Sequence, residues 1–120
     1  MSRILLVEDD PDLRFLLSHV LYDGGYEIDP AESFVAAKRR LGSKRYDLVL
    51  ADAILADGSG LTIADLAAEQ GIPALILTGY AARLAPDLGR YDYMLKPVPP
   101  GELLEAIGAR LKSAAATDPA

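Results

Sequence analysis

The residues of this 120-residue chain that are best suited to chemistry stand where apolar runs end. Glu8 and Asp9 follow the run 4–7, Asp52 follows 48–51, Thr78 follows 73–77, and Lys96 follows 91–95. Short apolar runs bounded by polar residues are typical of buried parallel strands. The carboxyl ends of such strands meet at one edge of an open α/β sheet, where ligands bind. We therefore expect these five side chains to share one crevice.

Carboxylates, a hydroxyl and an ammonium in one crevice would suit phosphoryl transfer. Oxygen ligands without imidazole or thiol favour Mg²⁺, and crowded carboxylates need a cation between them. Mg²⁺, Lys96 and Thr78 would neutralise phosphoryl oxygens while the Asp52 carboxylate attacks in line and forms an acyl phosphate. Without Mg²⁺ we expect the acids to be uncompensated, so that Asp52→Asn would raise stability.

The elements that must position these residues alternate along the chain. Asp10 suits a helix N-cap and Pro11 a first helical turn, and the apolar stripe that follows predicts a helix ending at Gly24 and Gly25. The remaining predicted helices cover 34–41, 61–70 and 99–112, and the predicted strands cover 4–7, 26–29, 48–52, 73–77 and 91–95. Between 80 and 90, Pro86 and Gly89 leave room for a short or irregular fourth helix only.

This alternation predicts an α/β fold. Strands that alternate with helices five times favour a doubly wound, five-stranded parallel sheet with helices on both faces and right-handed crossovers. We expect the flavodoxin-like strand order 2-1-3-4-5. The hydrophobic content of 51% suffices for one core. We assign residues 1–112 to a single folded domain and 113–120 to a flexible tail.

Composition excludes several functions. A net charge of −6 argues against binding to nucleic acid, which needs clustered Lys and Arg. The sequence has no cysteine, so it can form neither disulfides nor a thiolate metal site. It has no signal-peptide core and no apolar run approaching the length of a membrane span. We expect a cytoplasmic protein that binds no membrane.

The motifs around these residues resemble a known family. Segments 6–11 (Leu-Val-Glu-Asp-Asp-Pro), 47–52 (Asp-Leu-Val-Leu-Ala-Asp), 77–79 (Leu-Thr-Gly) and 95–97 (Leu-Lys-Pro) closely resemble those of receiver domains of two-component response regulators. The resemblance covers roughly residues 3–112. It implies that Asp52 accepts a phosphoryl group from a phosphohistidine on a histidine kinase or histidine phosphotransfer protein, and that the domain then controls a downstream signalling protein.

The resemblance also implies a set of Mg²⁺ ligands. Asp9 would bind the ion directly, and Glu8 would act mainly through water. Asp52 would be a second ligand and the backbone carbonyl of Ile54 a third.

A second group of residues would read the phosphorylated state, again by resemblance. Thr78 would bind a phosphoryl oxygen and move on phosphorylation, Lys96 would pair with the phosphoryl group, and the bond between Lys96 and Pro97 would be cis. Tyr93 occupies the family's aromatic switch position, although a half-buried strand tyrosine is the equal alternative. Tyr80 would belong to the moving loop.

Two features depart from the common pattern. Ala56 stands where many receivers have proline, so the loop after Asp52 should be less rigid. Only 18 positions separate Thr78 from Lys96, roughly one helical turn fewer than in the chemotaxis-type receiver. Such shortening resembles a stand-alone receiver subgroup with the signature Phe-x-Phe-Ala-Thr-Gly-Tyr. This chain keeps Thr-Gly-Tyr but has Ala74, Ile76 and Leu77 at the preceding named positions.

Three alternative functions stay open. A Mg²⁺-dependent aspartyl phosphohydrolase commonly has a second aspartate two residues beyond the nucleophile, but Ile54 stands there, so multiple-turnover catalysis is not expected. A pseudo-receiver that only binds partners need not retain the whole constellation. The chain could also be a receiver module of a hybrid histidine kinase, although Met1 and the tail favour a stand-alone protein.

Overall fold

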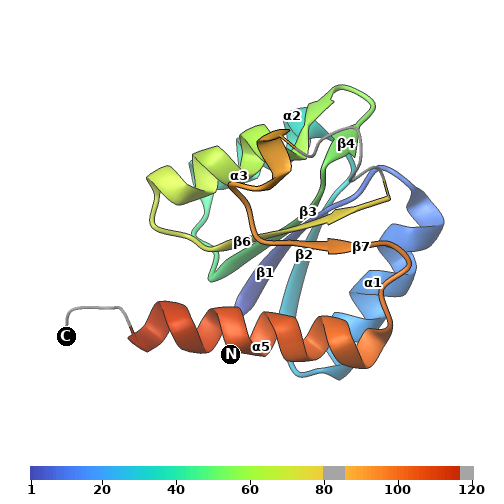
Figure 1. The fold of residues 1–120 in the computed structure, drawn as a ribbon, viewed down its shortest axis with the longest axis vertical. Helices are drawn as coiled ribbons and strands as arrows, with labels where there is room; N and C mark the ends of the chain where they lie inside the picture. Colours follow the sequence, from blue (N-terminus) through green and yellow to red (C-terminus); the bar gives the residue numbers. More distant parts are fainter. Residues whose placement is uncertain (80–85, 117–120) are drawn as a thin grey trace.

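Five segments of the sequence form the five strands of one parallel sheet, and the three central strands are the most apolar of them. The computed structural model describes residues 1–79 and 86–116 (Figure 1). The strands are β1 (Arg3–Val7), β2 (Glu27–Ala31), β3 (Leu48–Asp52), β6 (Ala74–Thr78) and β7 (Tyr93–Leu95). Their order in the sheet is β2-β1-β3-β6-β7, and every pairing in it is parallel. This confirms the predicted fold class and strand order.

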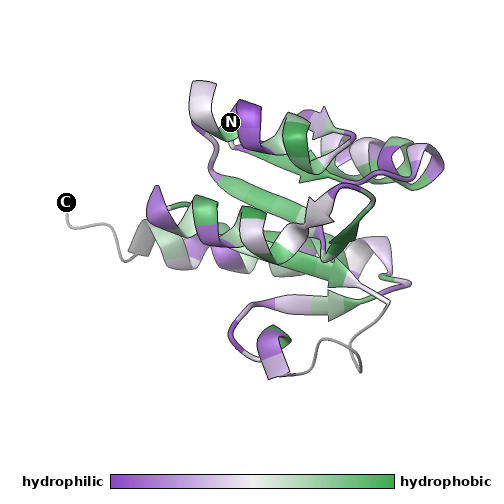
Figure 2. Cartoon of the chain, turned by 90° about the horizontal axis from the view of Figure 1, so that it is seen from above, coloured by the Kyte–Doolittle hydropathy of each residue, from purple (hydrophilic) through white to green (hydrophobic). Residues whose placement is uncertain are grey.

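Helices cover both faces of the sheet, which explains why the central strands are apolar throughout. Helices α1 (Pro11–Asp23) and α5 (Pro100–Ala116) lie on one face, and α2 (Phe34–Ser43) and α3 (Gly60–Glu69) lie on the other (Figure 1). Alternate residues of one strand enter opposite cores: Leu5 and Val7 face α2 and α3, whereas Ile4 and Leu6 face α1 and α5. In Figure 2 the central strands are accordingly hydrophobic along their length.

Helix α1 begins as predicted, and its apolar stripe is only partly buried. The Asp10 side chain accepts hydrogen bonds from the backbone N–H groups of Asp12 and Leu13, and Pro11 opens the helix. Leu17 and Leu21 are buried in the core, but Leu16 is 57% exposed. The predicted apolar stripe is therefore wider than the buried one, and its outer part lines a groove beside Lys96.

Several boundaries differ from the sequence prediction. Strand β2 starts at Glu27 and continues through Pro30 to Ala31, which an edge strand permits because its outer N–H groups have no ladder partner. Helix α5 continues to Ala116, so four residues assigned to the tail are helical; the alanine-rich run favours this. Strand β7 begins at Tyr93, two residues later than predicted. Of the fourth helix, the structure describes one helical turn at 86–88.

The loop after Asp52 contains a small hairpin that the sequence did not predict. Strands β4 (Ile54–Leu55) and β5 (Gly58–Ser59) pair antiparallel, and α3 begins directly after them. Gly60 allows this close return, because a Cβ there would lie 1.8 Å from the Asp52 carbonyl oxygen. None of the helices in residues 1–79 and 86–116 combines the length and the hydropathy of a membrane-spanning helix.

Candidate functional site

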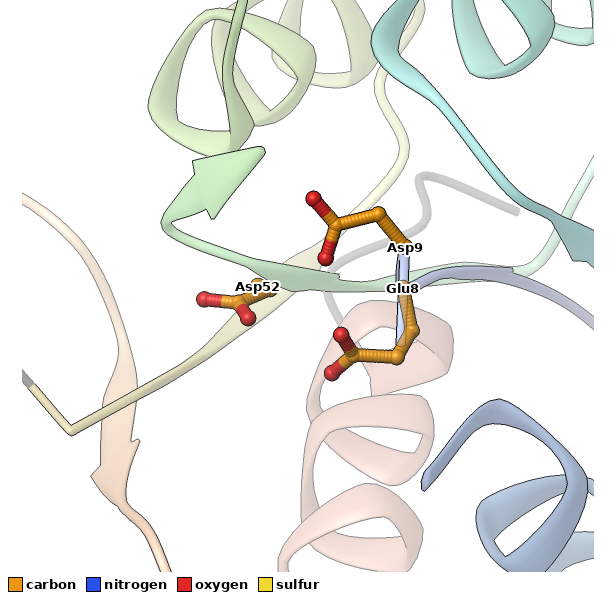
Figure 3. Close-up of side chains that lie close together, drawn as sticks. All are labelled: Glu8, Asp9 and Asp52. Carbon is orange, nitrogen blue, oxygen red and sulfur yellow. The ribbon is translucent and has the colours of Figure 1, made fainter. Parts of the chain in front are cut away.

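The predicted site residues lie at one edge of the sheet, at the carboxyl ends of its strands. Glu8 and Asp9 follow β1, Asp52 ends β3, Thr78 ends β6, and Lys96 follows β7. Glu8, Asp9 and Asp52 each offer a carboxylate oxygen, and these three oxygens lie within 4.8 Å of one another (Figure 3). The parallel register thus brings together residues that are more than 40 positions apart in the sequence.

Lys96 lies between two of the acids. Its Nζ is 2.8 Å from Asp52 Oδ2 and 3.0 Å from Glu8 Oε1. The expectation that the acids are uncompensated without Mg²⁺ is therefore wrong for Asp52 and Glu8, because the ammonium already pairs with both. The reason for expecting Asp52→Asn to raise stability is accordingly lost.

Glu8 is the buried member of the group, with 2% of its surface exposed. Its Oε2 accepts a hydrogen bond of 3.1 Å from the Asp10 backbone N–H, and its carbonyl accepts one of 2.9 Å from Arg14 Nη1. Burial raises the pKa of Glu8 above its ordinary value, although the hydrogen bonds from Lys96 and Asp10 oppose this rise. Glu8 is thus held in place from three sides.

Lys96 keeps its charge despite being partly buried. Burial lowers the pKa of Lys96, but the hydrogen bonds to Asp52 and Glu8 outweigh it, so that the pKa lies above its ordinary value. The side chain is therefore an ammonium at neutral pH. It can neutralise negative charge on oxygen atoms beside Asp52.

The hairpin places two backbone N–H groups against the partly exposed acids. Ala56 N–H donates to Asp9 Oδ2 at 2.8 Å, and Ile54 N–H donates to Asp52 Oδ1 at 3.2 Å. Each of these carboxylates is thereby oriented by the segment that follows Asp52. The sequence gives no signal for the Asp9 contact, because the two residues are 47 positions apart.

The donor set fits a hard divalent cation. With all groups ionised, three carboxylates and one ammonium carry a formal charge of −3 + 1 = −2. Asp9 and Asp52 are partly exposed, so that an ion can reach them. Their oxygen ligands match those that Mg²⁺ prefers. In the part of the chain that the structure describes, this is the only group of three metal-ligating side chains so close together.

The residues predicted to respond to phosphorylation differ in their exposure. Thr78 is fully buried, and its carbonyl accepts a hydrogen bond of 3.0 Å from Lys96 N–H. The peptide bond between Lys96 and Pro97 is cis. Tyr93 is 45% exposed on β7. Tyr80 lies outside the described residues.

A groove that sequence reasoning missed opens next to Lys96. It has a volume of about 430 Å³ and is lined mainly by apolar side chains of α1, of the segment 97–98 and of the start of α5. Leu13, Leu16, Val98 and Leu103 are among them. The sequence does contain one signal for this groove. The apolar stripe of α1 is wider than the face that the core buries, so its outer leucines are left to line a groove.

Sequence comparison identifies similar proteins along almost the whole chain. A family model described as the response regulator receiver domain matches residues 4–108. The DNA-binding response regulator MtrA of Mycolicibacterium smegmatis is 36% identical over 119 residues, which cover 92% of this chain and 51% of MtrA. The transcriptional regulatory protein GlrR of Escherichia coli is 36% identical over 124 residues, which cover 98% of this chain and 28% of GlrR. The chain thus spans about half or less of these curated relatives.

Solved structures agree with this similarity. A CheY-like response regulator receiver domain protein from Methanospirillum hungatei superposes with a TM-score of 0.86 at 27% identity, covering 97% of this chain and 98% of that one. The response regulator protein TrrA from Thermotoga maritima, in complex with Mg²⁺-BeF, superposes with a TM-score of 0.83 at 33% identity. The match covers 92% of this chain and 99% of the TrrA chain.

Proposed function

Because the chain belongs to the response regulator receiver domain family, we propose that Asp52 accepts a phosphoryl group from a phosphohistidine on a histidine kinase or histidine phosphotransfer protein. The observation that carries this proposal is the Lys96 ammonium, which lies 2.8 Å from one Asp52 oxygen within the acidic group. A nucleophilic carboxylate, a fixed cation and further oxygen ligands are what an in-line phosphoryl transfer needs.

The transfer is a direct displacement at phosphorus. An Asp52 carboxylate oxygen attacks and forms the new P–O bond, while the P–N bond of the phosphohistidine breaks. The electron pair of that bond stays on the imidazole, which then takes a proton from water. Lys96 is bound to Asp52 beforehand, so it can follow the negative charge onto the phosphoryl oxygens without crossing the site.

The acids would hold Mg²⁺ in this site. Asp9 and Asp52 would bind it directly, with the Ile54 carbonyl as a further ligand and Glu8 acting through water. The ion would supply charge neutralisation on the phosphoryl oxygens. The similarity to TrrA, solved in complex with Mg²⁺-BeF, supports Mg²⁺ as the cation.

Phosphorylation would then change the surface that a downstream signalling protein reads. Thr78 would turn its hydroxyl toward a phosphoryl oxygen, and the space it leaves would admit the Tyr93 ring. The exposed position of Tyr93 is compatible with such a movement, since the ring is not part of the core. Tyr80 belongs to the same proposal through its place after Thr78 in the sequence.

Two neighbouring functions are less well supported. Multiple-turnover phosphohydrolysis lacks its acid/base residue, since Ile54 occupies the position two residues after Asp52. MtrA is described as DNA-binding, but this chain spans only half of it, and a net charge of −6 does not favour contact of these residues with nucleic acid. We therefore propose a signalling receiver that acts through protein partners. The stand-alone arrangement, the 1–112 boundary and the cytoplasmic location stay predictions.

Intact mass spectrometry tests the proposal. The chain is incubated with acetyl phosphate, with and without Mg²⁺, beside the variant Asp52→Asn. We expect one added phosphoryl group that requires Mg²⁺ and is absent from the variant. An adduct that forms equally well without Mg²⁺, or that persists in Asp52→Asn, would contradict the proposal. If no adduct survives the assay, a titration with beryllofluoride followed by NMR should still shift amides near Asp52 and Thr78, and a flat titration would refute the site.

A further inference from the structure

Asp57, at the tip of the β4–β5 hairpin, caps a helix from outside that helix. Its Oδ1 accepts a hydrogen bond of 2.8 Å from Phe34 N–H, and its Oδ2 accepts one of 3.1 Å from Val35 N–H. These are the first two N–H groups of α2, which have no partner within the helix. Ser33, the local N-cap, takes the N–H of Ala36 instead. Asp57 therefore completes the cap of α2 across more than 20 residues of sequence.

The hairpin also packs against the same end of α2. A Cβ at Gly58 would lie 2.6 Å from Phe34 Cγ, so that only glycine allows the hairpin to lie this close to the ring. Strand β5 of this hairpin contacts α2, and Figure 1 shows the hairpin at that end of the molecule. The two backbone N–H donors lower the pKa of the Asp57 carboxyl below its ordinary value, which keeps this exposed group ionised at neutral pH.

The other side of the hairpin holds the acidic site. Ile54 N–H contacts Asp52, and Ala56 N–H contacts Asp9, so both partly exposed carboxylates are oriented by a segment of three residues. Asp57 is the next residue after that segment. One short hairpin is thus bound to the α2 N-terminus through Asp57 and to two site carboxylates through Ile54 and Ala56.

We propose that Asp57 is a positioning residue that couples Mg²⁺ binding at the acidic site to the N-terminus of α2. When Asp57 is bound to α2, the hairpin holds the Ile54 and Ala56 amides in register with Asp52 and Asp9. When that contact opens, the hairpin is free to shift, and the two carboxylates lose their common orientation. The inference rests on the proposed function, because it takes Mg²⁺ as the ion of the site.

Coupling of this kind is reciprocal, which gives it a signature that a purely structural cap lacks. If the Asp57 contact favours Mg²⁺ binding, Mg²⁺ must favour the Asp57 contact by the same factor. Mg²⁺ should therefore slow hydrogen exchange of the Phe34 and Val35 amides, although α2 supplies none of the proposed metal ligands. Loss of a residue that orients metal ligands typically costs about 10- to 100-fold in affinity. For an exposed contact we expect a change of about tenfold, the lower end of that range.

The test measures Mg²⁺ affinity by NMR titration of the full 120-residue chain and of Asp57→Ala. The matched control is Asp47→Ala: Asp47 is also exposed and also accepts from a backbone N–H, that of Arg3 at 2.7 Å, but at the opposite edge of the sheet. We expect Asp57→Ala to bind Mg²⁺ about tenfold more weakly and Asp47→Ala to bind it like the unaltered chain. Asp57→Asn, which keeps one acceptor oxygen, should lie between.

Each outcome decides the matter. A lower melting temperature of Asp57→Ala with unchanged Mg²⁺ affinity would show a structural cap and overturn the inference. Should Asp57→Ala fail to fold, exchange in the unaltered chain decides: Mg²⁺ must slow the Phe34 and Val35 amides, and unchanged rates would overturn it. An unaltered chain that gives no response to Mg²⁺ would refute the proposed function as well, whereas a normal response that Asp57→Ala leaves intact would refute only the coupling.

Discussion

The bridge that Lys96 makes between Glu8 and Asp52 predicts a pH-dependent loss of stability in Lys96→Met. The variant removes the ammonium but keeps an unbranched apolar side chain of similar length. It leaves two acids unpaired, one of them buried. Removing one partner of a fully buried pair costs about 3–5 kcal/mol. Because the Lys96 side chain is 25% exposed, solvent screening reduces this, and we expect about 2 kcal/mol near neutral pH.

The sign of the pH dependence follows from Glu8. Its pKa in the folded chain is raised above the ordinary value of 4.5, so its contribution favours folding below that value and is lost as pH rises through the raised pKa. Lys96→Met removes the hydrogen bond that opposes this rise. The variant should therefore lose more stability than the natural chain at alkaline pH, and the difference between the two should shrink as Glu8 becomes protonated.

Urea unfolding at about pH 8 and about pH 5 measures this difference. In thermal unfolding, about 2 kcal/mol corresponds to a melting temperature lower by about 8 °C for a domain of this size. Lys44→Met is the matched control, because Lys44 is 54% exposed and lies 3.7 Å from Asp29, which Arg40 also binds; it should cost less than about 0.5 kcal/mol. A loss equal at both pH values, or no larger than that of Lys44→Met, would refute the reasoning.

Three further predictions concern the same edge of the sheet and its supports. Gly60→Ala should destabilise the chain by more than about 2 kcal/mol in urea unfolding, because the added Cβ would overlap the Asp52 carbonyl; an unchanged midpoint would contradict the close approach. Gly108→Ala, inside α5, should instead stabilise by up to about 1 kcal/mol, because the added Cβ would lie 3.9 Å from the Tyr26 hydroxyl, at ordinary contact distance; a loss of stability would argue against this fit. Asp52→Asn should change stability by less than about 1 kcal/mol without Mg²⁺, because Lys96 keeps its contact with Glu8. Mg²⁺ should raise the melting temperature of this variant less than that of the natural chain. An equal rise in both chains would argue against Asp52 as a ligand.

The sheet and the placement of its polar residues could be predicted because they depend on local patterns. Continuous apolar runs such as 48–51 indicate strands covered on both faces, and the residue after each run must then lie at the carboxyl edge. That reasoning places Glu8, Asp52 and Lys96 at one edge from the sequence alone. Helix caps at Asp10 and Gly24 are equally local, since each acts within one turn of its own helix.

The contacts that set the electrostatics could not be predicted in this way. Lys96 reaches Glu8 across 88 positions, and which acids it pairs with depends on side-chain packing at the edge of the sheet. Asp57 reads locally as a turn residue before glycine, which gives no indication that it caps α2. Strand β2 was predicted over 26–29, but it continues through Pro30 because an edge strand tolerates proline. In each case the local sequence indicated the right type of element or residue, but its contacts depended on segments far away in the sequence.

The measurement that tests the central claim most directly locates the phosphoryl group within the chain. After incubation with Mg²⁺ and acetyl phosphate, borohydride converts an acyl phosphate to homoserine, and peptide mass spectrometry then identifies the modified position. We predict homoserine at position 52 and an unmodified Asp9, which lies within the same group of acids. Homoserine at Asp9, or at a position outside this edge of the sheet, would contradict the account.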